Sequence, residues 1–339
     1  MQKVRVEDAV GMVLAHDITR IVPGEFKGAA FRKGHIIREE DINSLLDLGK
    51  EHIYIWENKE GWLHENEAVE AIVKATAGAG VNLTEPREGK IIYEAAFNGI
   101  LKIDVNRLIQ INSVDQIVLS TLHNNRPVER GQMVASARIV PLIIEEEKIR
   151  EVQEIAGGVP VIEVKPLLSK RVGIVTTGSE VYKGRIKDAF GPTLQQKLNH
   201  YGCEVIRQTI VPDDPEMIKE AIREMRSFGA ELILTTGGMS VDPDDLTPSS
   251  IRDLGAKIVA HGSPVLPGSQ FMMAYWDDIP VMGLPGCVMY SRRTIFDLIL
   301  PRVLAGEIIK REDLTRLAHG GLCLNCEVCT YPNCGFGKS

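Results

Sequence analysis

The pattern of apolar and polar residues changes near residue 165. Before that point, short stretches of alternating apolar and polar residues are separated by turns, which is typical of strands. Helical spacing interrupts them in a few places, two of them closed by a glycine. We therefore predict a β-rich N-terminal region over residues 1–165, made of one or two small modules. Its expected helices lie at residues 39–49, 65–78 and 145–157, and its expected strands at 52–56, 88–95, 99–105, 115–122, 126–144 and 161–164.

From Arg171 onward, strands alternate with helices. Such alternation predicts a mostly parallel sheet covered by helices on both faces, which is the α/β class. The expected strands lie at residues 171–178, 203–211, 231–238, 256–260 and 279–286, and the expected helices at 191–202, 213–229, 247–255 and 288–306. We assign this α/β domain to residues 166–308 and a short Cys-rich tail to residues 309–339.

Two of these helices carry explicit start signals. An aspartate precedes Pro215 in the helix that Gly229 closes, and proline is well tolerated in the first turn. Thr247 is expected to cap the next helix, with Pro248 at its first position.

The composition narrows the functional classes. The chain has 339 residues, of which 44% are hydrophobic and 25% charged, as in ordinary globular proteins. Its net charge of -7 argues against a general nucleic-acid binder, which is normally basic. There is no apolar run near the roughly 20 residues of a membrane span. The N-terminus also lacks the apolar core of a signal peptide, so we expect a cytoplasmic protein with reduced thiols and no membrane partner.

Three expected strands end in similar signals. The stretches "TTGSE" (176–180), "TTGGMS" (235–240) and "GLPG" (283–286) all contain glycines, and the first two add the hydroxyls of Thr177, Ser179 and Ser240. Open α/β sheets bind ligands at the carboxyl ends of their strands, and glycine lets the backbone approach a ligand closely. Helix N-termini nearby favour a phosphate or another compact anion. The alternative is that these are tight turns with no ligand.

Aspartates follow the second of these stretches. Asp242, Asp244 and Asp245 would repel a bare phosphate. They suit a ligand that also has amino or amide donors, as a pterin does, or a divalent cation that bridges them to the ligand. The alternative is that they are solvated residues near a helix start, where negative charge is favourable.

These stretches carry a family resemblance. Residues 171–304 resemble the molybdopterin-binding domain shared by molybdopterin adenylyltransferases and molybdopterin molybdotransferases. The matching stretches are "VGIVTTGSEV", "LILTTGGMSVDPDDLTPSSI", "VLPGSQ" and "VMGLPG". The N-terminal "VRVEDAVGMVLAHDI" and the later "ASARIVPLII" resemble the molybdotransferase less closely. The resemblance implies a three-layer domain that binds molybdopterin or molybdenum cofactor.

The resemblance also implies roles for particular residues. Asp242 and Asp245 would act on the metal or the pterin as catalytic residues, with magnesium as a possible cofactor. The residues expected to bind the cofactor are Thr177, Gly178, Ser179, Glu180, Asp188, Gly237, Gly238, Ser240, Pro267, Gly268, Leu284, Pro285 and Gly286.

The chain departs from the family at positions that matter for catalysis. The family's serine-asparagine pair falls on Ala189 and Phe190, and its lysine falls on Ser269. Its asparagine-proline pair after the third turn falls on Cys287 and Val288. Lysine supplies a fixed positive charge to an oxyanion, which serine cannot replace. The departures therefore favour ligand binding over the family's usual catalysis.

The tail carries a separate signal. Cys323, Cys326, Cys329 and Cys334 form a Cys-x2-Cys-x2-Cys-x4-Cys run, which is typical of a metal site. Four thiolates suit either tetrahedral zinc or an iron–sulfur cluster. The spacing is near the ferredoxin run but one residue longer at its end, so the sequence leaves both metals open. A thiol-rich disordered tail is the alternative.

Three functional hypotheses follow. The first is a protein of molybdenum cofactor biosynthesis or delivery that acts as a magnesium-dependent molybdotransferase or nucleotidyltransferase. The second is a carrier or sensor that binds the cofactor without chemistry. The third is a nucleotide pyrophosphatase of the competence-damage type. We expect a homodimer, because the resembling family is oligomeric and sheet edges need cover. Its other partner would be a molybdoenzyme or a protein of cofactor biosynthesis.

Overall fold

The computed structural model describes residues 2–22, 24–55, 60–240, 242–243 and 245–338. The chain divides into two compact units. Unit 1 comprises Met1–Ala95, Asp104–Leu122 and Gly131–Glu163, and unit 2 comprises Ala96–Ile103, His123–Arg130 and Val164–Ser339. Unit 2 therefore includes two segments that precede residue 165.

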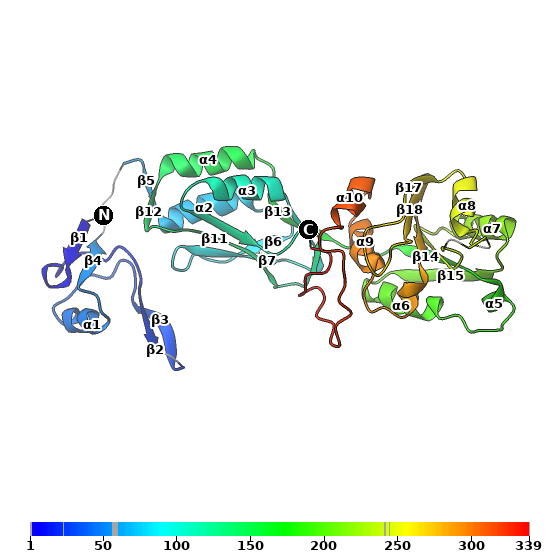
Figure 1. Ribbon diagram of the computed structural model, residues 1–339. Helices are drawn as coiled ribbons and strands as arrows, with labels where there is room; N and C mark the ends of the chain where they lie inside the picture. The colour runs from blue at the N-terminus through cyan, green and yellow to red at the C-terminus, as the bar shows by residue number, and fades with distance from the viewer. Residues whose placement is uncertain (1, 23, 56–59, 241, 244, 339) are drawn as a thin grey trace. The chain divides into compact units, whose positions relative to one another are not determined.

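Unit 1 is rich in strands, as predicted (Figure 1). Its largest sheet has the order β6-β7-β11-β9, with antiparallel neighbours; helices α2 and α3 pack on it, and α4 packs on these two helices. The strands are β1 Gln2–Arg5, β2 Ile18–Val22, β3 Phe26–Phe31, β4 His52–Ile55, β5 Trp62–His64, β6 Val81–Leu83, β7 Lys90–Ala95, β9 Ile117–Thr121, β11 Met133–Ile139 and β12 Ile143–Glu145. The helices are the 3-10 helix η1 Val6–Asp8, α1 Asp41–Asp47, α2 Glu65–Thr76, α3 Val105–Ser113 and α4 Glu146–Ala156.

The three helices predicted for this region are confirmed, but α3 was missed. The sequence interpretation ended a strand at residue 105, where α3 begins. The carboxylate of Asp104 accepts a hydrogen bond from the Arg107 N–H at 3.0 Å and caps the helix. An aspartate just after the strand was the available signal.

Unit 2 is built on a six-stranded sheet with the order β15-β14-β16-β19-β18-β17. A smaller sheet has the order β10-β8-β13. The strands are β8 Gly99–Ile103, β10 Arg126–Val128, β13 Ile162–Pro166, β14 Arg171–Thr177, β15 Glu204–Val211, β16 Leu232–Thr236, β17 Lys257–His261, β18 Met272–Trp276 and β19 Ile279–Leu284. The helices are α5 Ser179–Tyr182, α6 Phe190–His200, α7 Pro215–Ser227, α8 Thr247–Asp253, η2 Gly286–Met289, α9 Ile295–Leu304 and α10 Arg311–Arg316.

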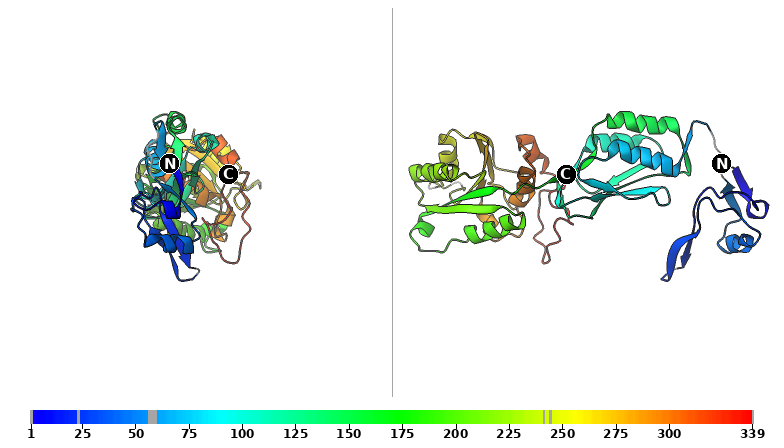
Figure 2. Two further views of the ribbon diagram at one scale, coloured as in Figure 1. Left: turned by 90° about the vertical axis from the view of Figure 1, so that its left-hand side faces the viewer. Right: turned by 180° about the vertical axis from the view of Figure 1, so that it is seen from behind.

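Helices cover both faces of the six-stranded sheet (Figure 2). Alternate residues of β14 point to opposite faces, as in any strand. Val172 and Ile174 pack with α6 and α9, whereas Val175 packs with α7 and α8. Strands β15, β14, β16 and β19 pair in parallel, and β18 pairs antiparallel with both of its neighbours. The predicted α/β class is confirmed for this unit.

Two predictions about its elements were wrong. Strand β18 was missed, and the single long helix expected over 288–306 is instead the short η2 followed by α9. Helix α9 begins later because Thr294 and Asp297 form a capping box. The Thr294 hydroxyl accepts from the Phe296 N–H at 3.2 Å, and Asp297 accepts from the Thr294 N–H at 2.8 Å.

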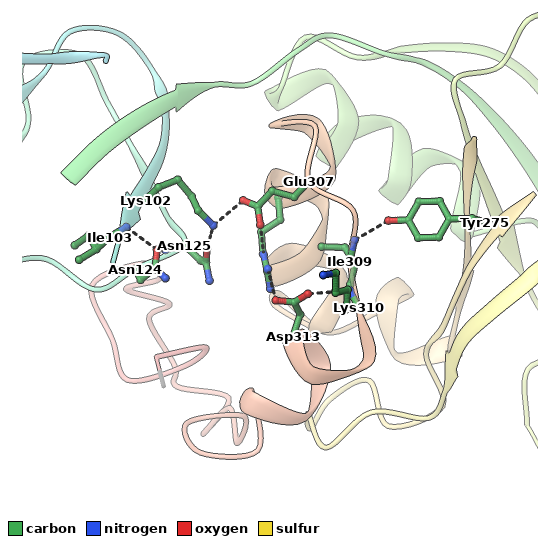
Figure 3. Close-up of polar contacts among 10 residues, drawn as sticks. Lys102, Ile103, Asn124, Asn125, Tyr275, Glu307, Ile309, Lys310 and Asp313 are labelled. Atoms are coloured by element: carbon green, nitrogen blue, oxygen red, sulfur yellow. Dashed lines mark hydrogen bonds and ion pairs between the residues drawn. The ribbon is translucent and has the colours of Figure 1, made fainter. Parts of the chain in front are cut away.

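An ion network joins β8 to α9 and α10 (Figure 3). The Lys102 ammonium lies 2.7 Å from Glu307, and the buried Arg302 guanidinium lies 3.0 Å from Glu307 and 2.7 Å from Asp313. Burial alone would raise the pKa of Asp313, but the hydrogen bonds from Arg302 and the Lys310 N–H outweigh it, so the pKa is lowered. Asp313 is therefore held in its charged form beside Arg302.

The structure adds one observation about membranes. None of the helices in the described ranges is both long and apolar enough to cross a bilayer.

Candidate functional site

Three neighbouring strands of the six-stranded sheet end level with one another. Thr176 of β14 pairs with Thr236 of β16, and Thr236 pairs with Leu284 of β19. Because the three strands run in the same direction, the turns that follow them emerge at one edge. The structure therefore brings together the three turns in which the sequence predicts a ligand site.

The turn after β16 requires two glycines. Gly237 and Gly238 have φ angles of +82° and +54°, a backbone region that side chains disfavour. A Cβ atom on Gly237 would lie 2.0 Å from the carbonyl oxygen of Thr177. One on Gly238 would lie 2.8 Å from the hydroxyl of Thr247. The bare backbone is thus needed for the turns to approach each other.

Buried threonine hydroxyls tie these turns together. The Thr177 and Thr247 hydroxyls lie 3.1 Å apart, and Thr247 donates to the Gly237 carbonyl at 3.0 Å. The expectation that Thr247 caps helix α8 was wrong, since the helix includes Thr247 and its cap residue is Leu246. The Thr247 side chain instead supports the glycine turn, because its hydroxyl reaches the adjacent strand end.

The turn after β14 differs from the expectation of an open anion site. The Ser179 N–H donates to a carboxylate oxygen of Asp213 at 2.8 Å, at the start of the short helix α5. Glu180 is exposed, and its carboxylate lies beside Gly178. The sequence interpretation missed Asp213, which supplies a negative charge where a phosphate was expected. Gly178 and Thr177 are buried at the strand end.

Asp188 has a visible structural role. Its carboxylate accepts hydrogen bonds from the N–H groups of Phe190 and Gly191 at 2.8 and 3.0 Å, at the start of α6. The Gln208 amide donates to the same carboxylate at 2.7 Å. A carboxylate at a helix N-terminus is stabilising. The predicted cofactor contact of Asp188 stays a prediction.

The loop before β18 reaches the same edge through Gln270. The Gln270 side-chain amide donates to the Ser240 hydroxyl at 3.2 Å. Gly268, which follows the half-buried Pro267, packs so closely that a Cβ atom would lie 2.5 Å from Ile295. Gln270 was missed because its partner, Ser240, lies 30 positions away in the sequence. The hydrogen bond connects two loops that were predicted separately.

Asp242 and Asp245 form a small turn of their own. The Asp242 N–H donates to a carboxylate oxygen of Asp245 at 3.0 Å, and the Asp245 N–H donates to the Asp242 carbonyl at 3.0 Å. Asp242 is exposed and Asp245 half-buried, whereas Asp244 lies outside the described residues. Carboxylate oxygens are the donors that magnesium prefers, so the donor type fits.

The turn after β19 begins at the buried Leu284 and Pro285 and continues into η2 through the exposed Gly286. Cys287 follows and is half-buried. Burial raises the pKa of the Cys287 thiol, which keeps it protonated at neutral pH. A neutral thiol is a poor nucleophile, so Cys287 does not supply a reactive thiolate here.

The four tail cysteines lie outside this edge. All of them line one cavity of about 450 Å³, together with residues 290–293. Cys326 and Cys329 are exposed, and Cys323 and Cys334 are half-buried. Across the described ranges, no three or more His, Cys, Asp or Glu side chains are grouped closely enough to hold a metal ion. The predicted zinc or iron–sulfur site therefore stays a prediction.

The tail is nevertheless packed against the rest of unit 2. The N–H of Cys323 donates to the Leu266 carbonyl at 2.8 Å, and the N–H of Leu266 donates to the Gly321 carbonyl at 2.8 Å. Arg126 hydrogen bonds to Asn333, and Phe336 is 6% exposed. These contacts contradict the alternative of a disordered tail.

Level ends of parallel strands, followed by glycine turns, are the place where open α/β domains bind their ligands. Residues 173–305 match the family described as probable molybdopterin binding domain. Residues 3–57 match a family described only as a domain of unknown function.

Individual relatives match parts of the chain. A molybdopterin molybdenumtransferase of Synechococcus elongatus is 34% identical over 118 residues, which are 32% of this chain and 29% of the relative. A CinA-like protein of Mycobacterium avium is 41% identical over 93 residues, which are 27% of this chain and 21% of the relative. The solved structure of the molybdopterin biosynthesis enzyme MoaB from Thermus thermophilus covers 41% of this chain and 98% of its own, at 26% identity and a TM-score of 0.35. The chain spans less than a third of the length of these curated relatives.

Proposed function

We propose that unit 2 binds molybdopterin or molybdenum cofactor at the edge where β14, β16 and β19 end. One observation carries the proposal: the half-exposed Gly237–Gly238 turn is fixed at the level ends of parallel strands by close packing on Thr177 and by the hydroxyl of Thr247. Bare backbone backed by fixed hydroxyls suits the phosphate of such a ligand. The protein would act in molybdenum cofactor biosynthesis or delivery, in the cytoplasm.

The aspartates would meet the other part of the ligand. Asp245 and Asp242 would accept hydrogen bonds from pterin amino groups, or hold a magnesium ion that bridges to the phosphate. Ser240, steadied by Gln270, would donate to the phosphate side. The aspartate carboxylates and the Ser240 hydroxyl lie close together in the chain. A single ligand that has a phosphate at one end and pterin amino groups at the other would contact both.

Binding without chemistry is the form of the proposal that the residues favour. Ser269 stands in the place of the family's lysine, and the Cys287 thiol is neutral. Asp213 also adds negative charge beside the first turn. A charge-stabilised transfer of molybdate or nucleotide needs a cation that these positions do not supply. The protein would therefore hold or deliver the cofactor.

The test is to incubate the pure protein with molybdopterin, magnesium, molybdate and either ATP or CTP. Retention of one ligand per chain without product supports the carrier. Turnover to an adenylated, cytidylated or molybdated product supports the transferase instead. A failure to retain molybdopterin under any of these conditions contradicts the proposal.

A second function has its own observation. CinA-like proteins match this chain at up to 41% identity over 93 residues. A nucleotide pyrophosphatase would hydrolyse a dinucleotide substrate at the same edge, with magnesium on Asp242 and Asp245. Release of nucleoside monophosphate in the absence of molybdopterin would favour this function.

The remaining parts of the proposal concern assembly and the tail. We expect a homodimer, checked by light scattering at micromolar concentration, and a molybdoenzyme or cofactor-biosynthesis protein as recipient. The α/β unit would be a three-layer, mostly parallel molybdopterin-binding domain, followed by a tail whose four cysteines hold zinc or an iron–sulfur cluster.

A further inference from the structure

We propose that the cavity lined by Cys323, Cys326, Cys329 and Cys334 holds an iron–sulfur cluster. The cavity also has Arg292 and Arg293 in its wall, and it lies outside the strand-end site. Cluster binding stands on these residues alone. A second step, in which the cluster influences the ligand site, rests on the proposed function.

The loop that carries the thiols is fixed by contacts on both sides. Before the run, Leu266 exchanges hydrogen bonds with Gly321 and Cys323. Within and after it, Tyr331 donates to the Asp297 carbonyl at 3.3 Å, and Asn333 bonds to Arg126. Cys323, Tyr331 and Cys334 pack against the core. A loop held in this way presents its thiols in one place, which lowers the entropy lost when they bind a metal group.

The separation of the thiols argues against a single ion, because across the described ranges no three of the four lie close enough together to hold one metal ion. The cavity that all four cysteines line, with a volume of about 450 Å³, leaves room for a larger group. One zinc ion would require all four sulfurs to converge to about 2.3 Å from a single centre. An iron–sulfur core instead spreads its bonds to the cysteines around its outside. Three cysteines at two-residue intervals also match the start of the ferredoxin run.

The charges around the cavity suit a negative group. Four thiolates outweigh the positive charge of an iron–sulfur core, so the bound cluster is anionic. Arg293 lines the cavity beside Cys329 and stacks on the Tyr331 ring at 4.8 Å, and Arg292 donates to the Glu327 carbonyl at 2.5 Å. Hydrogen bonds to cluster sulfurs and nearby cations stabilise the cluster and tune its potential.

The same loop touches two elements of the proposed ligand site. Leu266, which bonds to Cys323, directly precedes Pro267 and Gly268. The Ile295 N–H donates to the Pro267 carbonyl at 3.3 Å. Arg293, two residues earlier, lines the cavity beside Cys329 and donates to the carboxylate of Asp297 at 3.0 Å. Because the same loop holds Leu266 and borders Arg293, a cluster bound in it would further restrain Pro267–Gly268, and we expect molybdopterin affinity to rise with cluster occupancy.

The first experiment measures the cluster in the full chain, without molybdopterin. The protein is purified under anaerobic conditions and reconstituted with ferrous iron and sulfide. We expect about four iron and four sulfide per chain, with visible absorption that dithionite bleaches. Cys326→Ser and Cys329→Ser, at exposed positions, should abolish loading while the circular dichroism spectrum is kept. Cys203→Ala, in the core, should load normally.

The outcomes separate the parts of the proposal. One zinc per chain with no sulfide, or unchanged loading in both serine variants, overturns the cluster. Molybdopterin affinity is then compared between loaded protein and Cys326→Ser, with an expected loss of at least about fivefold. Equal affinities overturn the linkage and leave the cluster in place. No molybdopterin binding to either form overturns the proposed function, and the iron and sulfide content still decides the cluster.

Discussion

The strand-end site and the cysteine loop present their binding groups in opposite ways. At the strand ends, the sheet fixes the half-exposed backbone of Gly237 and Gly238, which we propose as the ligand site. In the tail, the proposed binding groups are side chains, and contacts with distant residues such as Arg126 and Leu266 fix the loop. Regular secondary structure is enough to position a binding site that consists of backbone groups. A site made of side chains on an irregular loop needs other elements to hold it.

The largest expected effect concerns Gly237→Ala. The new Cβ would lie 2.0 Å from the Thr177 carbonyl at a φ of +82°, so either the turn moves or β14 does. We expect a loss of at least about 3 kcal/mol in the free energy of unfolding, and molybdopterin binding below detection. Urea denaturation and calorimetric titration measure the two effects.

Gly255→Ala is the matched control. Its φ of +83° is nearly the same, but no atom lies within 4 Å of the added Cβ. It should cost only about 1 kcal/mol and leave ligand binding unchanged. Equal losses in the two variants would show that backbone strain alone, and not the close approach of the turns, explains Gly237.

Arg293→Gln should have the next largest effect, now on the side-chain site. Asp297 is 5% exposed and would keep Lys197, at 2.7 Å, as its remaining cation. We expect a loss of about 2 kcal/mol in stability and weaker cluster retention on exposure to a chelator. Arg223→Gln, which breaks an exposed helical pair with Glu220, should cost about 0.5 kcal/mol or less. If Arg293→Gln lost no more stability than Arg223→Gln, Arg293 would not hold the cysteine loop in place.

The same contrast explains how far the sequence could predict the molecule. Strand ends follow from apolar runs broken by glycine, so the stretches at Thr177, Gly237 and Leu284 were found, and the parallel pairing of their strands brings them together. Residues that could either cap a helix or support a neighbouring turn were harder to assign from the sequence. Thr247 could start α8 or support the turn, and only the position of the neighbouring strand decides between them.

Partners that are distant in sequence could not be predicted. Nothing in the run of cysteines indicates that Leu266 pairs with it or that Asn333 bonds to Arg126. Asp213 and Gln270 were missed for the same reason, since each acts on a residue 30 or more positions away. Strand β18 was missed because its apolar run "FMMAYW" follows a loop closely and carries no turn signal of its own.

Asp188→Ala tests whether a predicted cofactor residue is structural. It removes an acceptor for two backbone N–H groups at the start of α6 and for the Gln208 amide. We expect a loss of about 1–2 kcal/mol in the free energy of unfolding, as for other helix caps. Asp188→Asn, which keeps one acceptor oxygen, should lose less. If molybdopterin affinity falls in Asp188→Asn while stability does not, the residue contacts the ligand directly.

Ser269→Lys, which adds a positive charge at the strand-end edge, has the smallest expected effect. Ser269 is exposed and stands where the family has a lysine, next to Gln270 and its partner Ser240. Ser269→Lys should leave stability within about 0.5 kcal/mol. A solvent-exposed cation near the ligand phosphate contributes about 1 kcal/mol or less, so molybdopterin affinity should rise by up to about fivefold, and the gain should shrink in high salt. Ser227→Lys adds the same charge at the far end of α7, which begins beside the ligand edge and ends away from it. An equal gain in both variants would assign the effect to net charge, and no gain in either would mean that the phosphate does not bind near Ser269.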